Sequence, residues 1–305
     1  MKRRDFLKVC LASGATASLG VTSKSWAGGS FEGYPDAMGV LVDTTRCIGC
    51  RSCEAACNKE QKLPEPDVSF DDTSVFDHPR RTSEKAYTVV NRYQTGDAQT
   101  PPYRKMQCNH CNEPGCLTSC FVNAYTKTKE GAVIYNGKVC VGCRTCMVAC
   151  PFNIPAYSYS SAFNPLIKKC ILCYDTRLKF GLPPACVEIC PQEALTFGLR
   201  KDLIKMAHER IRETPDRYYD HVYGEKEVGG TSWLYLSKGP FDQIGLDTTL
   251  SNDPIISNVK EFLGMVPMVL TIWPALFSGI HLLATRNKDH GDDHDNHSEQ
   301  EGGKQ

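Results

Sequence analysis

The chain has 305 residues, and its 35 Lys and Arg residues balance its 35 Asp and Glu residues, so the formal net charge is zero. This balance gives no support to nucleic-acid binding. The hydrophobic fraction of 41% excludes wholesale disorder, and the mean hydropathy of −0.35 excludes a polytopic membrane protein. The length allows two domains or one large one, and the 17 cysteines are the compositional feature that points to a function.

Residues 1–27 have the pattern of a secretory signal peptide. A basic start is followed by the apolar, small-residue run 9–22, and small residues precede a cleavage site after Ala27. Arg3 and Arg4 resemble the pair of the twin-arginine signal, which is an address read by a receptor. The alternative is a short amphipathic anchor helix, which the glycines and the Ser/Thr content disfavour.

Short strands, cysteine loops and short helices alternate through the next part of the chain. Strand-like runs occupy 39–43, 132–136 and 194–197, and after each of the first two a helix is expected near the third cysteine of a loop. Residues 42–53 and 135–146 repeat one another, which indicates a duplication. Beyond Cys10, the cysteines form four motifs: Cys47, Cys50, Cys53, Cys57; Cys108, Cys111, Cys116, Cys120; Cys140, Cys143, Cys146, Cys150; and Cys170, Cys173, Cys186, Cys190.

The spacing of these motifs predicts [4Fe–4S] clusters. The first and third are C-x2-C-x2-C-x3-C, and the second and fourth widen one gap to four and twelve residues. A tight loop wraps three thiolates onto one cluster, and the fourth cysteine serves the other cluster of a pair. Each cluster is therefore expected to take three ligands from one motif and one from another. Gly49 and Gly142 suit such crowded loops.

Zinc sites and disulfides are the alternatives. Structural zinc uses two C-x2-C pairs, which leaves a third nearby cysteine without a role. Sixteen cysteines in an exported chain could form eight disulfides. However, the contiguous spacing is poor disulfide geometry, and the twin-arginine route carries proteins that are already folded with their cofactors. Both observations favour iron–sulfur clusters.

Three polar residues lie beside these cysteines. Arg51 and Arg144 could raise a cluster's potential, but we interpret them as solvated surface residues. His110 lies between Cys108 and Cys111, and we interpret it as a loop or supporting residue rather than an iron ligand.

Two segments lie outside the motifs. Residues 67–99 read as an insertion that is rich in Pro, Asp and Ser and contains a strand at 85–93. Residues 201–255 combine a helix at 203–213 with a Gly-rich stretch, and we expect them to pack on the cysteine-rich part or on a partner subunit.

Residues 262–285 contain no Asp, Glu, Lys or Arg and predict a transmembrane helix, since about 20 apolar residues cross a bilayer. A buried core helix is the alternative. Arg286 and Lys288 place the C-terminus on the cytoplasmic side. His281 could be a functional intramembrane group or an interfacial one. The acidic, His-containing tail 286–305 is predicted to be disordered.

With four motifs in this order, the chain resembles the four-cluster electron-transfer subunits of membrane oxidoreductases, a family that includes the β subunits of formate dehydrogenase, dimethyl sulfoxide reductase and polysulfide reductase. Residues 107–111 and 223–231, the signal and the C-terminal apolar run are most similar to the iron–sulfur subunit of hydrogenase-2-type enzymes. One departure is Phe121, where the family has proline.

The resemblance implies an α+β fold of two interleaved ferredoxin-like units with short strands and helices, plus the C-terminal transmembrane helix. The first unit is split between 35–66 and 160–200, and the second, 100–159, is inserted within it. The implied ligand sets are set 1 (Cys47, Cys50, Cys53, Cys190), set 2 (Cys57, Cys170, Cys173, Cys186), set 3 (Cys108, Cys111, Cys116, Cys150) and set 4 (Cys120, Cys140, Cys143, Cys146).

The resemblance further implies a non-catalytic subunit whose four [4Fe–4S] clusters pass electrons between a periplasmic catalytic subunit and a quinone-reactive membrane subunit. A [NiFe] hydrogenase is the favoured catalytic partner. A formate dehydrogenase, nitrite reductase or sulfur-compound reductase is the alternative, and a zinc or disulfide scaffold is an alternative of another class. The expected location is the periplasmic side of the inner membrane, with anchoring through the bilayer and a cytoplasmic tail.

Overall fold

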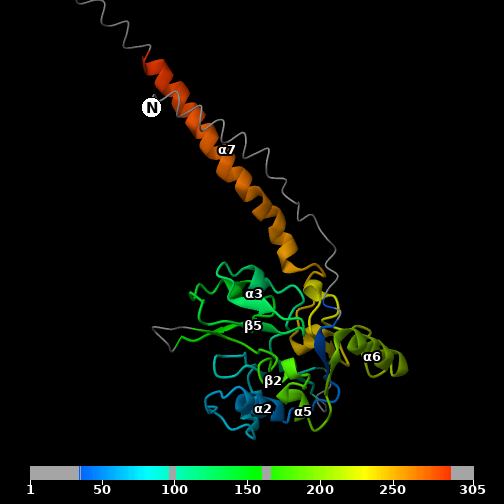
Figure 1. Cartoon of the computed structure of the whole chain (residues 1–305). Helices are drawn as coiled ribbons and strands as arrows, with labels where there is room; N and C mark the ends of the chain where they lie inside the picture. The colour runs from blue at the N-terminus through cyan, green and yellow to red at the C-terminus, as the bar shows by residue number, and fades with distance from the viewer. Residues whose placement is uncertain (1–33, 35, 96–100, 160–165, 290–305) are drawn as a thin grey trace, which may run out of the picture. The chain divides into compact units, whose positions relative to one another are not determined.

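The structure, a computed structural model, describes residue 34 and residues 36–95, 101–159 and 166–289 (Figure 1). Its strands are β1 (Met38–Asp43), β2 (Val89–Arg92), β3 (Tyr103–Met106), β4 (Tyr125–Lys127), β5 (Val133–Tyr135), β6 (Ala156–Tyr157), β7 (Ile167–Lys168), β8 (Leu195–Leu199) and β9 (Trp233–Leu236). Its α-helices are α2 (Ser52–Glu60), α3 (Gly115–Thr118), α4 (Thr145–Val148), α5 (Ala185–Glu188), α6 (Arg200–Glu213) and α7 (Ile255–Asp289). The described part is thus a mixed α/β arrangement of small sheets and short helices.

The central sheet has the order β8-β1-β9. Strand β1 runs antiparallel to β8, with Val40 opposite Phe197, and parallel to β9, with Val40 opposite Trp233. The strands predicted at 39–43 and 194–197 are therefore confirmed. Their pairing joins the chain just before the first cysteine motif to the chain just after the last.

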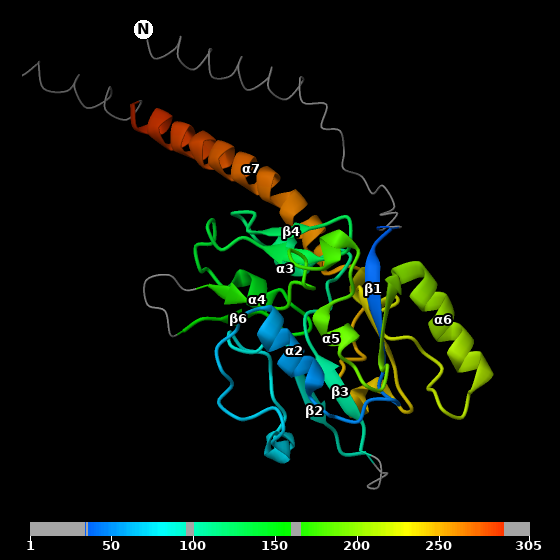
Figure 2. The same ribbon diagram turned by 60° about the horizontal axis from the view of Figure 1, so that its bottom comes forward.

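The two faces of β1 bury different side chains, as a period of two requires. Val40 and Val42 pack on one face with Trp233 and with Cys186 of α5. Leu41 points to the other face, where it packs with Leu203 and other apolar side chains of α6. Helix α6 lies beside β1 (Figure 2). It begins at Arg200, three residues before the predicted start at 203. Full burial of each such aliphatic side chain stabilises the fold by about 1.5–3 kcal/mol.

The segment between the first and last motifs forms three two-stranded sheets. Strand β2 pairs with β3, β4 with β5, and β6 with β7, each antiparallel. Strand β5 confirms the prediction at 132–136. Strand β2 is shorter than the predicted 85–93, because the N–H of Ala86 donates to the carbonyl of Ser83 in a turn.

The segment 201–255 packs on the central sheet through β9. Arg200, at the start of α6, holds this segment in place, because its guanidinium donates to the carbonyls of Thr231 at 2.7 Å and Glu225 at 2.7 Å. Of the two expected docking surfaces, the cysteine-rich part of the chain is the one that this segment contacts through β9, and packing on a partner subunit stays a prediction.

Helix α7 occupies the region of the predicted transmembrane helix. Across the described residues, no helix combines the length and the apolar character needed to cross a membrane. The transmembrane helix predicted at 262–285 is therefore not supported. Residues 286–289 were predicted to be disordered, but they continue α7. Residues 1–27 and 290–305 lie outside the described part of the chain, including Arg3 and Arg4.

Candidate iron–sulfur sites

The two cysteine loops of the internal repeat share one backbone geometry. Gly49 and Gly142 have φ angles of +73° and +70°, while Arg51 and Arg144, just before α2 and α4, have φ angles of +59° and +64°. Glycine adopts positive φ without steric cost. At Gly49, a Cβ atom would in addition overlap the ring of Tyr103. The repeat recognised in the sequence therefore extends to the backbone of both loops.

All four cysteines of set 1 line one cavity. Three belong to the loop and helix after β1, and Cys190 lies in the turn between α5 and β8. The β1–β8 pairing brings them together, because the N–H of Asp43 donates to the carbonyl of Ala194 at 2.8 Å. Cys47 and Cys190 interact electrostatically, as expected of neighbouring thiols.

All four cysteines of set 3 line a second cavity. Cys108, Cys111 and Cys116 come from the loop after β3 and from α3, and Cys150 follows α4. The other three thiols are the leading electrostatic neighbours of Cys111. Helices α3 and α4 pack against each other, and this contact brings the two motifs together.

The cysteines of sets 2 and 4 are also gathered across motifs. Cys57 interacts electrostatically with the other three thiols of set 2, because α2 packs against α5 (Figures 1 and 2). Cys146 interacts in the same way with the other three thiols of set 4. The structure thus brings together the members of each of the four sets that the resemblance implied. That each set ligates one cluster stays a prediction.

The donor chemistry of the four sets fits iron–sulfur clusters. All sixteen described cysteines are free thiols, so none is in a disulfide. Burial raises the pKa of Cys47 to about 11 and the pKa values of Cys116 and Cys170 to about 12. Metal binding requires the thiolate and releases these protons. Among the described residues, no three His, Cys, Asp or Glu side chains are placed to hold a single metal ion.

Thiols of neighbouring sets also lie close enough to influence one another electrostatically, and these neighbours order the sets in a row. Cys53 of set 1 interacts electrostatically with Cys186 of set 2. Cys170 of set 2 interacts with Cys108 of set 3. Cys116 of set 3 interacts with Cys146 of set 4. The order in space is therefore 1, 2, 3, 4.

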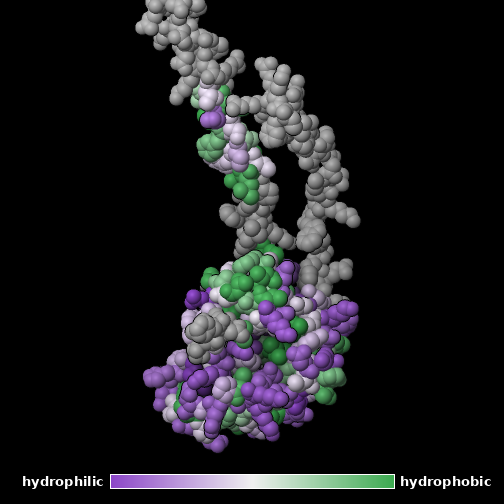
Figure 3. All heavy atoms as spheres, turned by 60° about the vertical axis from the view of Figure 1, so that its left-hand side comes forward, coloured by the Kyte–Doolittle hydropathy of each residue, from purple (hydrophilic) through white to green (hydrophobic). Residues whose placement is uncertain are grey.

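The two ends of this row reach the surface. Among the described cysteines only Cys50, in set 1, and Cys143, in set 4, are exposed. Apolar side chains surround set 4, and those that are exposed are Phe121, Val139, Val141 and Val148, the last with an exposed fraction of 89%. Figure 3 shows hydrophobic residues gathered on one part of the surface. Helix α3, which carries Cys116, contacts α7.

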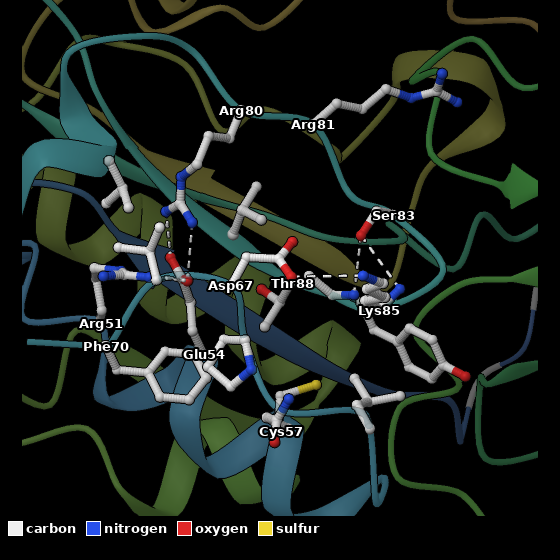
Figure 4. A pocket seen from close by; sticks show the side chains of 18 residues that line it. Arg51, Glu54, Cys57, Asp67, Phe70, Arg80, Arg81, Ser83, Lys85 and Thr88 are labelled. Carbon is white, nitrogen blue, oxygen red and sulfur yellow. Dashed lines mark hydrogen bonds and ion pairs between the residues drawn. The ribbon is translucent and has the colours of Figure 1, made fainter. Parts of the chain in front are cut away.

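Arg51 is not the solvated surface residue that the sequence suggested. Its exposed fraction is 3%, and its guanidinium donates to the Glu54 carboxylate and to the carbonyls of Ser69 and Asp72, at 2.7 and 2.8 Å for the carbonyls. Figure 4 shows Arg51 and Arg80 on either side of Glu54. Arg51 is buried because the insertion folds over the first cysteine loop. Arg144 is exposed as predicted, 4.8 Å from the ring centroid of Tyr157.

His110 is completely buried, with a φ of +49°. Its Nδ1 accepts the backbone N–H of Val133 at 2.9 Å, so the proton of the neutral ring resides on Nε2. Burial and the charge of Lys169 hold the pKa of His110 well below its usual value. Within the described residues, Nε2 has no hydrogen-bond partner. A buried donor without a protein acceptor fits a site that holds a sulfur-rich group.

Sequence reasoning missed the buried lysines beside the cysteines. Lys105 lines the cavity of set 1, and Lys169 lines the cavity of set 3. No local pattern indicates this burial, because Arg104 and Lys105 are consecutive in β3 and both are buried. Burial opposes the charge on Lys105, but the negative charges of the nearby cysteines in their thiolate form together outweigh burial and raise the pKa of Lys105 above its usual value.

Comparisons with known proteins identify iron–sulfur relatives of this chain. Residues 101–200 match the 4Fe-4S dicluster domain family. A chain from Nitratidesulfovibrio vulgaris is 52% identical over 94% of this chain and 78% of its own length. The hydrogenase-2 operon protein HybA of Escherichia coli O157:H7 is 33% identical over 97% of this chain and 99% of its own length. The iron-sulfur subunit of the nitrate-inducible formate dehydrogenase of Escherichia coli K12 is 33% identical over 87% of this chain and 92% of its own length. The chain therefore belongs to the family of iron–sulfur subunits that includes HybA and the formate dehydrogenase iron-sulfur subunits.

Proposed function

We propose that this chain is an electron-transfer subunit that holds four [4Fe–4S] clusters and connects a catalytic subunit to a quinone-reactive membrane subunit. The observation that carries the proposal is the row of four cysteine sets with one exposed thiol at each end, Cys50 and Cys143. A chain that stored or sensed metal would have no need of a continuous row between two surfaces.

The residues of the chain have defined tasks in this proposal. The sixteen thiolates would hold the clusters, and each bound cluster supplies one-electron redox chemistry. Burial of Cys57, Cys116, Cys173 and Cys186 keeps water away from the middle of the row. Set 1 and set 4 each have one exposed cysteine through which their cluster could exchange electrons with a partner protein. The apolar surface around set 4 favours a protein contact there.

No catalytic activity is proposed for the chain itself. All sixteen described cysteines belong to one of the four sets, which leaves each cluster with a complete set of four protein ligands. An iron with no open coordination position has no place for a substrate. The relatives named as iron-sulfur subunits are consistent with such a role.

Metal analysis tests the proposal. The full chain, purified without oxygen, should contain about 16 iron atoms and as much acid-labile sulfide, and should be brown, because four clusters of four irons are expected. Zinc in place of iron, in a colourless protein, would support the scaffold alternative and end the proposal. About eight irons would reduce the number of clusters to two.

We further propose that the catalytic partner is a hydrogenase. The similarity to HybA extends over 97% of this chain and 99% of that protein, whereas the formate dehydrogenase subunit aligns over 87% and 92% at the same identity of 33%. The catalytic subunit that co-purifies with the chain decides between the partners. A formate dehydrogenase, nitrite reductase or sulfur-compound reductase would replace the hydrogenase without changing the electron-transfer role.

We also propose that the chain is exported to the periplasm by the twin-arginine route. The support is the sequence around Arg3 and Arg4. Changing Arg3→Lys together with Arg4→Lys should leave the chain in the cytoplasm at its precursor length, as seen by fractionation and immunoblotting. Changing Lys2→Arg and Lys8→Arg is the control and should leave export intact. Export of the double Arg3/Arg4 variant at the normal level would contradict the proposal.

A further inference from the structure

Lys105 is a buried cation that forms no ion pair within the described part of the chain. Its exposed fraction is 3%. Its Nζ donates to Oε1 of Gln107 at 3.1 Å and lies 4.6 Å from the ring centroid of Trp233. Among the described residues, no carboxylate forms an ion pair with it. Buried charges are normally paired, so the counter-charge for Lys105 must come from another group.

The groups that face Lys105 are the thiols of two sets. It lines the cavity of set 1 together with the four cysteines of that set. Its leading electrostatic partners are Cys53 of set 1 and three cysteines of set 2, namely Cys57, Cys170 and Cys186. Lys105 therefore lies between the first two positions of the row and faces both.

The surrounding fold fixes the position of the ammonium group. Strand β3 places Lys105 opposite Val90 of β2. The Nε2 of Gln107 donates to the hydroxyl of Tyr235 at 2.6 Å, which turns the Oε1 of the same amide toward Lys105. Tyr235 is fully buried in β9 and donates in turn to the carbonyl of Lys105 at 3.3 Å. The ammonium group is thus held in place by the pairing of β3 with β2 and by the hydrogen bonds that link Lys105, Gln107 and Tyr235.

We propose that Lys105 is a positioning residue that raises the reduction potentials of the clusters held by set 1 and set 2. This inference rests on the proposed function. A four-thiolate cluster is an anion and gains one further negative charge when it is reduced, so a fixed buried cation stabilises the reduced form. Because one lysine faces two sets, its charge acts on both clusters together.

Lys169 provides a matched comparison within the same chain. Its exposed fraction is also 3%. Its Nζ donates to the carbonyl of Cys170 at 3.1 Å and to the carbonyl of Val133, and it lines the cavity of set 3. Cys116 and Cys150 of set 3 are among its electrostatic partners. Removal of the charge of Lys169 is therefore expected to shift the reduction potential of a different cluster, the one held by set 3.

The test is a redox titration of the full chain followed by EPR, with iron content measured on each sample. Lys105→Met removes the charge and keeps the apolar stem. It should lower the midpoint potentials of two of the four clusters by about 59 mV each. This shift corresponds to a change of about tenfold in the equilibrium constant for reduction of each cluster. Lys105→Arg keeps the charge and should leave these potentials near those of the unchanged chain. Lys169→Met should lower a potential that Lys105→Met does not change.

Each outcome decides the proposal. Unchanged potentials in Lys105→Met at full iron content, or an equal shift of all four clusters, would overturn it. If Lys105→Met loses iron, Lys105→Gln takes its place, because a neutral amide can still contact Gln107. Loss of iron from both neutral variants but not from Lys105→Arg would show a role in assembly instead and would also overturn the proposal. If the unchanged chain itself contained no iron, the proposed function would be wrong. The test therefore distinguishes a failure of the proposed function from a failure of the proposal for Lys105.

Discussion

Replacement of both Cys190 and Cys50 by alanine should remove no more iron than the loss of one cluster, about four atoms per chain. Both side chains line the same cavity although they belong to the fourth and the first motif. If they ligate one cluster, the second substitution has nothing further to remove. The measurement is iron and sulfide per chain after anaerobic purification.

The matched control replaces Cys190 together with Cys173, which lies in the same motif but in set 2. Cys173 interacts with Cys186 and with Cys57 from the first motif. This pair should therefore cost two clusters, about eight irons, and thus about twice the loss of the first pair. The reverse result, with the larger loss from Cys190 and Cys50, would mean that each motif holds its own cluster, and the assignment of the sets would be wrong.

The parts of the site that the sequence predicted are those governed by short-range spacing. The positions of β1, β5, β8 and the starts of α2 and α4 follow from local patterns, and the positive φ angles of Gly49 and Gly142 follow from the crowding of thiols in a short loop. Which motifs lie together could be stated only from the resemblance, because it depends on the long-range pairing of β1 with β8.

The parts that sequence reasoning missed depend on contacts between distant segments. Lys105 is buried because β2, β3 and β9 enclose it, and an alternating or helical pattern does not reveal such a site. Arg51 is buried because residues 69–72 fold over it. The apolar run 262–285 predicted a membrane-spanning helix. The structure has a helix there, but among the described residues no helix is long and apolar enough to cross a membrane.

Loss of the Glu54 carboxylate should release the insertion from the first cysteine loop. Glu54 has an exposed fraction of 4%. It pairs with Arg80 at 2.6 Å and Arg51 at 3.2 Å, and it accepts the N–H of Val90 at 2.6 Å (Figure 4). It therefore joins α2 and the first cysteine loop to two parts of the insertion, Arg80 and strand β2, through one side chain. Glu54→Gln would leave two guanidinium groups without their carboxylate, which costs about 3–5 kcal/mol for a buried pair.

The expected consequence is local opening, and limited proteolysis of the iron-loaded chain measures it. Cleavage within residues 67–82 should become at least about a hundredfold faster in Glu54→Gln, because the population of the open form follows its free energy when opening is fast. Asp67→Asn is the matched control: its pair with Lys85 is exposed, with side-chain exposures of 84% and 50%, so it should change cleavage little. Equal cleavage of Glu54→Gln and the unchanged chain would mean that the apolar contacts of the insertion hold it in place. In that case the ion pairs of Glu54 would not hold the insertion on the cysteine loop, and Arg51 would only satisfy the carbonyls to which it donates.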